Sequence, residues 1–356
     1  MTYQELIEQA DLWFSQEKPF VLFSYPESTQ LFAYFQHSSE KYTTVSFDEK
    51  GFVMAPFDYK KTALIIPAAH SSCECVALPE ITNHLKEDVK FPDESKGEKK
   101  HVSIVEKTID EINLGEIKKI VISRQKDVTL SKFSLKTLID QVFTKDYNGL
   151  KYVWFHPETA IWCGTTPETL LKLKGGDFST ISLAGTKLPQ KGFRTFWSEK
   201  EIEEQEIVTH AIFDSLKNIT PVLKMSKPYT HQAGSIVHLR TDVTGIVKKN
   251  KAKLEKFINA LHPTPAVCGM PMEASKSFIL ENEQYDRQFY TGFLGDINNE
   301  TRGSHLFVNL RSMQIKNDIA SLFVGGGIIK QSNPQEEWLE TQNKLQTMGK
   351  VVAPML

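Results

Sequence analysis

The sequence is poor in cysteine, and the few cysteines present are not spaced as ligands or disulfide partners. The four are Cys73, Cys75, Cys163 and Cys268, and none belongs to a C-x-x-C pair. Structural zinc sites and disulfide frameworks both depend on such groupings. We therefore expect reduced cysteines that serve as packing residues.

Long apolar runs and an excess of one charge are absent as well. No uninterrupted apolar stretch approaches the ~18 residues of a membrane helix, and acidic residues within residues 1–14 do not fit a signal or transit peptide. Lys and Arg total 42 against 44 Asp and Glu, a net charge of −2. Such a balance gives no electrostatic reason to bind nucleic acid or anionic membrane. We expect a cytoplasmic, monomeric enzyme that acts on a small molecule.

Several motifs of nucleotide-binding and hydrolytic enzymes are also missing. The sequence has no P-loop, no G-x-S-x-G elbow and no H-E-x-x-H helix. The run Gly325-Gly326-Gly327 lacks the G-x-G-x-x-G spacing of a dinucleotide fingerprint. After a strand, its backbone N–H groups could instead face an anion.

What the sequence does contain is enough apolar residue for one large core or two smaller ones. It has 356 residues, of which 40% are hydrophobic and 24% charged. Many of its β-rich runs are joined by short turn-like links, at 174–177 and 316–318 for example, so a regular βαβ series is disfavoured. We predict an α+β fold with large, mostly antiparallel sheets. The expected strands are residues 20–24, 31–35, 63–66, 119–123, 152–155, 169–174, 236–247, 306–315 and 320–324.

A charged segment divides the chain. Residues 84–101 (HLKEDVKFPDESKGEKKH) include Pro92 and Gly97 and have almost no apolar periodicity, which favours an exposed loop or linker. We expect residues 1–83 to be a variable amino-terminal part of the same α/β unit. Residues 102–356 then form the larger, functional region.

A predicted helix over residues 198–219 carries the first candidate ligand. Ser198 and Glu201 form the S-x-x-E capping box of a helix start. At about 100° per residue, Glu204 falls within the apolar stripe, whereas Glu203 and Glu206 do not. An acidic first turn favours the helix dipole, but a carboxylate facing the core is costly unless it binds a cation. Both interpretations of Glu204 stay open on spacing alone.

A second helix begins at Asn333-Pro334, a cap residue followed by proline at the first helical position. Glu340 and Lys344 lie four residues apart on the flank of its apolar stripe. Spacing alone favours an exposed ion pair there, which contributes roughly a few tenths of a kcal/mol.

Several short motifs occur in a characteristic order. They are Lys119-Ile-Val-Ile-Ser-Arg124, Thr166-Pro-Glu-Thr-Leu170, Leu183-Ala-Gly-Thr186, Leu261-His-Pro-Thr-Pro-Ala-Val267, Tyr290-Thr-Gly292, Asn309-Leu-Arg311, Gly325-Gly-Gly-Ile328 and Glu337-Trp-Leu-Glu-Thr341 with Lys344. In this order and spacing they resemble the chorismate-utilising enzymes, which include isochorismate, salicylate, anthranilate and aminodeoxychorismate synthases. The resemblance covers about residues 100–356. It implies large antiparallel sheets packed face to face, with helices on the outside.

Within that family, two positions separate the chemistries. A lysine at the position of Lys119 goes with enzymes that use water as nucleophile, so no glutaminase subunit is expected. Aminodeoxychorismate synthases have a reactive lysine where this chain has Ala184. The run from Leu261 to Val267 is similar to isochorismate synthases of the enterobactin and menaquinone kinds. The resemblance therefore implies an isochorismate synthase, an isomerase.

The resemblance also implies roles for particular residues. Lys119 would be the base that activates water, and Glu168 the acid, with a pKa raised by burial. Glu204 and Glu340 would bind Mg²⁺, a hard cation that suits carboxylates. The substrate would be bound by Gly185, Thr186, His262, Tyr290, Arg311, Gly326, Gly327 and Lys344, with Arg311 and Tyr290 at the enolpyruvyl carboxylate.

Two alternatives remain. One is a salicylate synthase, which forms isochorismate and then eliminates pyruvate in the same site. The other is a non-catalytic binding protein on a degenerate chorismate-enzyme fold, although the presence of Lys119, Glu168, Glu204 and Glu340 weighs against it. The sequence does not decide whether the product feeds menaquinone or siderophore synthesis; menaquinone synthesis is our hypothesis.

Overall fold

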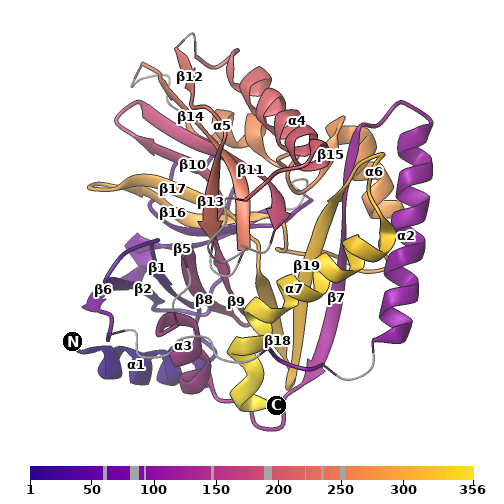
Figure 1. Cartoon of the computed structure of the whole chain (residues 1–356). Helices are drawn as coiled ribbons and strands as arrows, with labels where there is room; N and C mark the ends of the chain where they lie inside the picture. Colours follow the sequence, from indigo (N-terminus) through magenta and orange to yellow (C-terminus); the bar gives the residue numbers. More distant parts are fainter. Residues whose placement is uncertain are drawn as a thin grey trace.

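The computed structural model describes the chain except for residues 59–61, 81–87, 92–93, 146–147, 188–194, 221, 234–235 and 249–252, and the side chains of Ala184, Thr186, Lys200, Ala233 and Ile236. Its described strands form two large antiparallel sheets, with helices on their outer faces (Figure 1). The predicted α+β architecture is confirmed.

The first sheet combines strands from both ends and the middle of the chain. Its strands, in spatial order, are β15 (Gly269–Met270), β7 (Lys119–Thr129), β19 (Ile319–Ile328), β18 (Ser312–Lys316), β9 (Ala160–Thr166), β8 (Leu150–His156), β1 (Phe20–Ser24), β2 (Gln30–Gln36) and β6 (Ser71–Ala77).

The second sheet is assembled in the same way. Its order is β12 (Leu223–Met225), β14 (Ile236–Ile246), β11 (Asp177–Lys187), β10 (Thr169–Lys174), β17 (Gly303–Val308), β16 (Phe293–Asn299), β4 (Gly51–Ala55), β5 (Ala63–Pro67) and β3 (Thr43–Thr44), with β13 (Tyr229–Ala233) also paired to β14. Strands from before residue 84 thus belong to both sheets.

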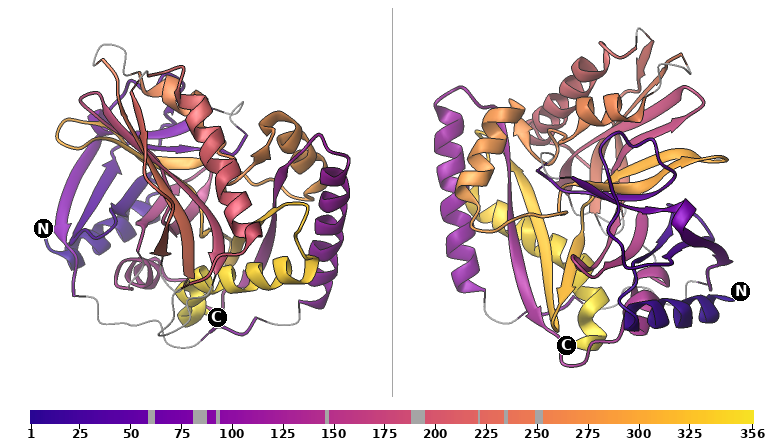
Figure 2. Two further views of the ribbon diagram at one scale, coloured as in Figure 1. Left: turned by 45° about the horizontal axis from the view of Figure 1, so that its top comes forward. Right: turned by 180° about the vertical axis from the view of Figure 1, so that it is seen from behind.

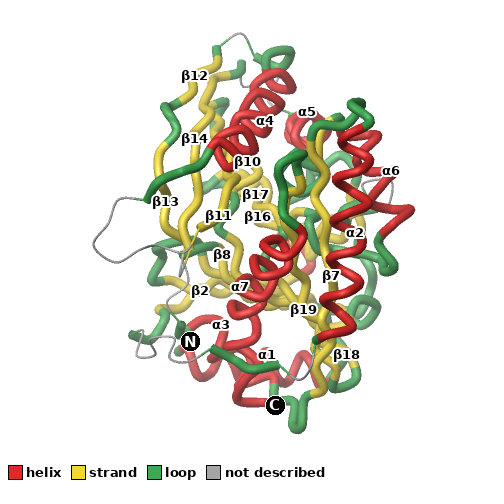
Figure 3. The backbone as a smooth tube through the Cα atoms, turned by 45° about the vertical axis from the view of Figure 1, so that its right-hand side comes forward, coloured by secondary structure: helices red, strands yellow, loops and turns green. Residues whose placement is uncertain are grey.

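Helices cover the outer faces of both sheets (Figure 3). α1 (Tyr3–Ser15), α3 (Leu135–Phe143) and α7 (Pro334–Val352) pack on the first sheet, and α4 (Glu199–Leu216) and α5 (Leu254–Leu261) on the second. α2 (Ser95–Asn113) and α6 (Met272–Asn282) pack beside β7 at one side of the molecule (Figure 2). Among the described residues, short 3₁₀ helices span Ala68–His70 and Ala353–Met355. Within the described residues, no helix is long and apolar enough to cross a membrane.

The sheets pack face to face through an aromatic core. In β8, Tyr152 and Trp154 face the other sheet, whereas Val153 and Phe155 face the helices. Successive strand residues point to opposite sides, so a strand buried on both faces is apolar throughout. This explains why the strands read as continuous apolar runs.

The expected single strand over residues 306–315 is wrong. β17 ends at Val308 in the second sheet, and β18 begins at Ser312 in the first. The chain crosses between the sheets at this point, and Arg311 there has a left-handed backbone, with φ 45°. β-rich residues lie on both sides of the crossing, so their composition did not reveal it.

A second crossing lies beside the first. The chain leaves the first sheet at the end of β9 and enters the second at β10, through Pro167 and Glu168. The Thr166 hydroxyl donates to Val308 O at 2.6 Å, and Val308 N donates to Glu168 O at 3.0 Å. These two hydrogen bonds fix the crossings against each other.

Part of the expected linker is helical. α2 begins at Ser95, so residues 95–101 belong to its first turns. His101, Val105, Thr108 and Ile112 are buried at helical spacing, while the charged residues between them face solvent. The charges that suggested a loop are the exposed face of this amphipathic helix.

Candidate active site

Most of the residues expected in the site line one pocket, although they come from distant parts of the chain. The pocket lies where the two crossings meet β11, β14, β19, α4 and α7. The expected residues in its wall are Glu168, Gly185, Glu204, Tyr290, Arg311, Gly326, Gly327, Glu340 and Lys344.

Lys119 begins β7, and its side chain is fully buried, whereas Lys118 beside it is exposed. Neighbouring strand residues face opposite sides, so only one lysine of the pair can enter the protein. The Lys119 Nζ donates to Glu204 Oε1 at 3.0 Å. The predicted difference between the two lysines is confirmed. Lys119 is not among the lining residues of the pocket, but its amine contacts Glu204, which is.

Glu168 is buried in the link between β9 and β10, with 3% of its surface exposed. Burial raises the pKa of its carboxyl to about 8, although the positive charges of Lys119 and Lys344 oppose that rise. At neutral pH the carboxyl therefore holds a proton. A protonated carboxyl in a pocket can act as a general acid.

Gly326 and Gly327 of β19 allow carboxylates to approach the strand closely. A Cβ atom at Gly326 would lie 3.0 Å from Glu337 Oε2 and 3.8 Å from Glu340 Oε1. A Cβ atom at Gly327 would overlap Glu204 Oε1. Three carboxylates thus converge on two glycines, because no side chain of the strand keeps them away.

Each expected metal ligand is paired with a lysine. Glu204 accepts from Lys119, and Glu340 Oε1 lies 2.7 Å from the Lys344 Nζ, which also donates to Gly325 O at 2.8 Å. The side chains of Glu340 and Lys344 are 24% and 20% exposed. Spacing alone predicted an exposed pair, but both side chains are largely covered and line the pocket.

The carboxylates match the needs of a hard divalent cation. In the part of the chain that the structure describes, no group of three or more His, Cys, Asp or Glu side chains is arranged as a complete metal cage. Mg²⁺ commonly takes only one or two protein carboxylates and completes its shell with waters and substrate oxygens. Glu204 and Glu340, which share one pocket, fit that pattern.

Arg311 is held by a histidine that the sequence analysis did not single out. The Arg311 Nη2 lies 3.1 Å from His238 Nε2, and His238 Nδ1 lies 3.0 Å from Gly185 O. A carbonyl oxygen only accepts, so Nδ1 carries the hydrogen and Nε2 accepts from the guanidinium. Burial, assisted by the Arg311 charge, lowers the pKa of His238 well below its usual value. The neutral ring therefore orients Arg311 in the pocket.

Tyr290 lies deeper in the wall. Its ring is buried and stacks on Phe323 at 5.4 Å between centroids. Burial raises the pKa of its hydroxyl, so Tyr290 stays protonated and can donate a hydrogen bond.

Glu337 is the other residue that sequence reasoning missed. It is 1% exposed, and its Oε1 accepts from the Ser332 hydroxyl at 2.7 Å. It precedes Glu340 by three residues and so shares its helix face, a signal that the spacing already contained. His238 gave no such signal, because only strand pairing brings β14 beside Gly185.

One expected site residue lies away from the lining of the pocket, and the side chain of another is undescribed. His262 is not among the lining residues of the pocket. Its ring packs edge-on to Phe293, 5.0 Å between centroids, beside the backbone of Pro56 and Phe57. It follows directly on α5, whose buried face carries it into the core of the second sheet. The side chain of Thr186 lies outside the described residues.

Comparison with known proteins agrees with this arrangement. The sequence profile of the family "Chorismate binding enzyme" matches residues 65–353, a longer part than the short motifs covered. Isochorismate synthase EntC of Escherichia coli (strain K12) is 31% identical over 245 residues, 65% of this chain and 62% of the relative. Isochorismate synthase MenF of Bacillus subtilis (strain 168) is 30% identical over 259 residues, 68% of this chain and 53% of the relative. The match thus spans less than two thirds of each relative.

Solved structures share the fold over nearly the whole chain. DhbC of Bacillus anthracis superposes with a TM-score of 0.81 at 24% identity, covering 98% of this chain and 99% of that one. The menaquinone-specific isochorismate synthase MenF of Escherichia coli has a TM-score of 0.77 at 19% identity, covering 95% and 89%. The family profile, the relatives and the shared fold all indicate the same family as the motifs that line the pocket. The chain therefore belongs to the chorismate binding enzyme family.

Proposed function

We propose that this chain is an isochorismate synthase, which interconverts chorismate and isochorismate with Mg²⁺. The observation that carries the proposal is that a buried carboxyl, Glu168, whose pKa is about 8, lines the pocket, while a buried amine, Lys119, contacts the lining residue Glu204. Relatives named isochorismate synthases support it. A lysine at the position of Lys119 goes with water as nucleophile, so the enzyme acts without a glutaminase.

The reaction needs a base and an acid in one site. Water attacks C2 of chorismate, the ring double bond migrates, and the C4 hydroxyl leaves. Lys119 takes the proton of the attacking water, and Glu168 supplies the proton that the departing hydroxyl needs. Burial keeps Glu168 protonated until it is used, and the return reaction exchanges the two roles.

Glu204 and Glu340 would hold the metal, and Glu337 lies next to them on Gly326. Mg²⁺, when bound, would neutralise the ring carboxylate of the substrate and withdraw electron density from the diene. Lys344 forms an ion pair with Glu340. It would therefore lie near the ring carboxylate of the substrate. The chain itself thus supplies two acidic metal ligands, Glu204 and Glu340, and one positively charged side chain, Lys344, for this substrate carboxylate.

The second substrate carboxylate requires its own cation. Arg311 lines the pocket and is oriented by the neutral ring of His238 at 3.1 Å. A guanidinium can bind a carboxylate through two parallel hydrogen bonds, which fixes position as well as charge. Arg311, with Tyr290 in the same pocket, therefore binds the enolpyruvyl arm.

The decisive experiment is to incubate purified protein with chorismate and MgCl₂ and to identify the products by chromatography and mass spectrometry. We expect an equilibrium mixture of chorismate and isochorismate, and no release of pyruvate. Salicylate with stoichiometric pyruvate would identify a salicylate synthase instead. Unchanged chorismate, with binding detected by calorimetry, would favour the non-catalytic alternative.

The metal assignment has a separate test. Glu204→Ala and Glu340→Ala should each remove Mg²⁺ binding in a calorimetric titration with MgCl₂ and should abolish metal-dependent turnover. Glu206→Ala, at an exposed position of the same helix as Glu204, is the matched control and should behave as wild type. Unaltered Mg²⁺ affinity in both pocket variants, or full turnover in EDTA, would exclude these two ligands.

A further inference from the structure

A buried ion pair lies directly behind the pocket wall. Glu283 follows α6, Arg287 lies four residues further on, and each side chain is only 2% exposed. Taking two charges out of water costs several kcal/mol per ion unless their hydrogen-bonding capacity is filled. The partners of this pair therefore show what it stabilises.

The guanidinium of Arg287 connects several separate segments. Nε and Nη2 donate to the two carboxylate oxygens of Glu283 at 2.7 and 2.6 Å. Nη2 also donates to Val121 O at 2.7 Å. Nη1 donates to Val267 O at 2.9 Å and to the Thr291 hydroxyl at 3.2 Å. Val121, Val267 and Thr291 all line the pocket, so Arg287 joins three parts of its wall from behind.

The pair also takes the place of a strand. β15 is only two residues long and pairs with β7 at Lys119 and Ile120. Beyond that point, one more backbone bond joins Val121 N to Cys268 O at 2.8 Å. Arg287 then satisfies Val121 O, and Glu283 Oε1 accepts from Ser123 N at 2.7 Å. The outer edge of β7 is thus completed by two side chains where the neighbouring strand has ended.

Val121, whose carbonyl oxygen Arg287 binds, lies two residues after the proposed base, Lys119. On its other edge β7 pairs with β19, with Val121 opposite Gly327. The Lys119 Nζ reaches the same glycine, 3.1 Å from where its Cβ would be. A displacement of β7 toward its outer edge would therefore move Lys119 relative to Gly327 and Glu204. Misplacement of a reacting group by about 1 Å can cost ~10²-fold in rate.

We propose that Arg287, together with Glu283, positions Lys119 by acting as a substitute strand on the outer edge of β7. Neither side chain lines the pocket, so the pair acts through β7 and not on the substrate. The inference rests on the proposed function, because it assigns Lys119 as the group whose placement limits turnover.

The test replaces Arg287 by lysine, which keeps a positive charge for Glu283 but cannot reach both carbonyls. We expect kcat for isochorismate formation to fall ~10- to 100-fold while KM stays within about 2-fold, because the substrate contacts are retained. The control is Arg302→Lys in another carboxylate–arginine pair, that of Asp296, away from the pocket. That variant should keep wild-type kcat.

A second variant separates positioning from charge balance. Arg287→Met combined with Glu283→Gln leaves no buried charge, so it should fold, yet it lacks the link to Val121 O. We expect the kcat loss to persist in the double variant. Wild-type kcat in the double variant would show that the pair only balances charge and would overturn the proposal.

Hydrogen exchange supplies a readout that does not depend on activity. Peptides covering residues 117–124 should exchange faster in Arg287→Lys than in wild type or in Arg302→Lys. Unchanged exchange in that strand would contradict the substitute-strand role. Inactive wild-type protein would overturn the proposed function, whereas active wild type with unimpaired Arg287→Lys would overturn only the positioning role.

Discussion

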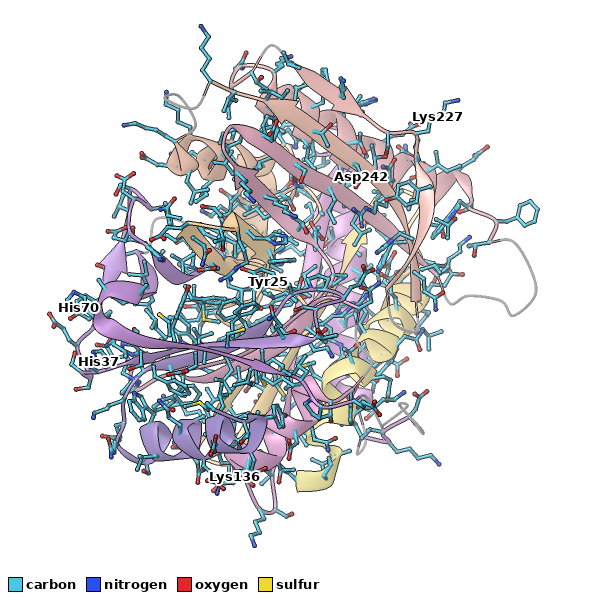
Figure 4. All side chains as sticks on the ribbon, turned by 90° about the vertical axis from the view of Figure 1, so that its left-hand side faces the viewer. Tyr25, His37, His70, Lys136, Lys227 and Asp242 are labelled. Atoms are coloured by element: carbon cyan, nitrogen blue, oxygen red, sulfur yellow. The ribbon has the colours of Figure 1, made fainter. Side chains whose placement is uncertain are left out.

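Two buried carboxyl groups in this molecule have different environments. Asp296 lies between the two sheets, fully buried, and accepts hydrogen bonds from Tyr34 at 2.8 Å, Tyr25 at 3.3 Å and Arg302 at 2.8 Å. Figure 4 shows Tyr25 between the amino-terminal strands and the second sheet. Glu168 is also buried, but it lies in the pocket.

Burial raises the pKa of both groups, with different results. At Asp296 the three donors oppose burial by stabilising the charged form. At Glu168 the charges of Lys119 and Lys344 oppose burial, but its pKa still reaches about 8. A carboxylate surrounded by fixed donors holds elements together, whereas one that burial keeps protonated can exchange its proton with a ligand. The environment, and not burial itself, separates a structural carboxyl from a chemical one.

Replacing each of the two carboxyls by its amide should separate their roles, and the largest loss of turnover is expected at Glu168. Glu168→Gln removes the acid, and we expect kcat to fall ~10²- to 10⁴-fold. Asp296→Asn leaves the pocket intact, so turnover at low temperature should stay near wild type while the thermal midpoint falls. Steady-state kinetics and calorimetry on both variants would check this. Equal losses of kcat would remove the distinction between the two carboxyls.

A comparable loss is expected at the proposed base. Lys119→Ala should lower kcat ~10²- to 10⁴-fold with little change in substrate binding. Lys118→Ala, beside it on the exposed side of the strand, should be nearly wild type. Similar turnover in both variants would show that the base lies elsewhere.

A smaller effect, on binding, is expected for Arg311. Arg311→Ala should raise KM ~10- to 100-fold, because a guanidinium–carboxylate contact contributes roughly 1.5–3 kcal/mol. Arg302→Ala, which removes the guanidinium of the Asp296 cluster, should leave KM unchanged. An unaltered KM in Arg311→Ala would exclude Arg311 from substrate binding.

The raised pKa of Glu168 also predicts how stability changes with pH. The unfolded pKa of Glu168 is about 4.3 and the folded one about 8. The folded state therefore binds the extra proton between these values, and stability falls as pH rises through them. Glu168→Gln should remove that loss, ~1.4 kcal/mol per pKa unit, and raise the thermal midpoint at pH 9 but not at pH 4. A midpoint difference that does not vary with pH would contradict the raised pKa.

The sequence predicted those parts of the site that depend on local periodicity. Strand alternation distinguished Lys119 from Lys118, and helix projection turned Glu204 inward while Glu203 and Glu206 remained exposed. The capping box at Ser198 and the cap at Asn333 begin their helices as predicted. These features depend on neighbours within one turn or one pair of residues, which the sequence displays directly.

The parts that depend on long-range packing could not be predicted. The crossing at Arg311 has β-rich residues on both sides, so composition predicted one strand. His238 enters the site through the pairing of β14 with β11, and Glu283 and Arg287 through the end of β15. His262 was assigned to the pocket from its motif, but the helix before it carries it into the core. In each case tertiary pairing decides, and no local signal encodes it.

The smallest effect concerns the backbone of Arg311, whose φ of 45° is one that glycine adopts without steric cost. A side chain there costs about 1 kcal/mol, so Arg311→Gly should be more stable than Arg311→Ala by roughly that amount, measurable in urea. Both variants should be equally impaired in binding. At this crossing, the proposed binding role and the backbone conformation favour different amino acids, so a screen for thermostability alone would select against the arginine that we propose binds the substrate.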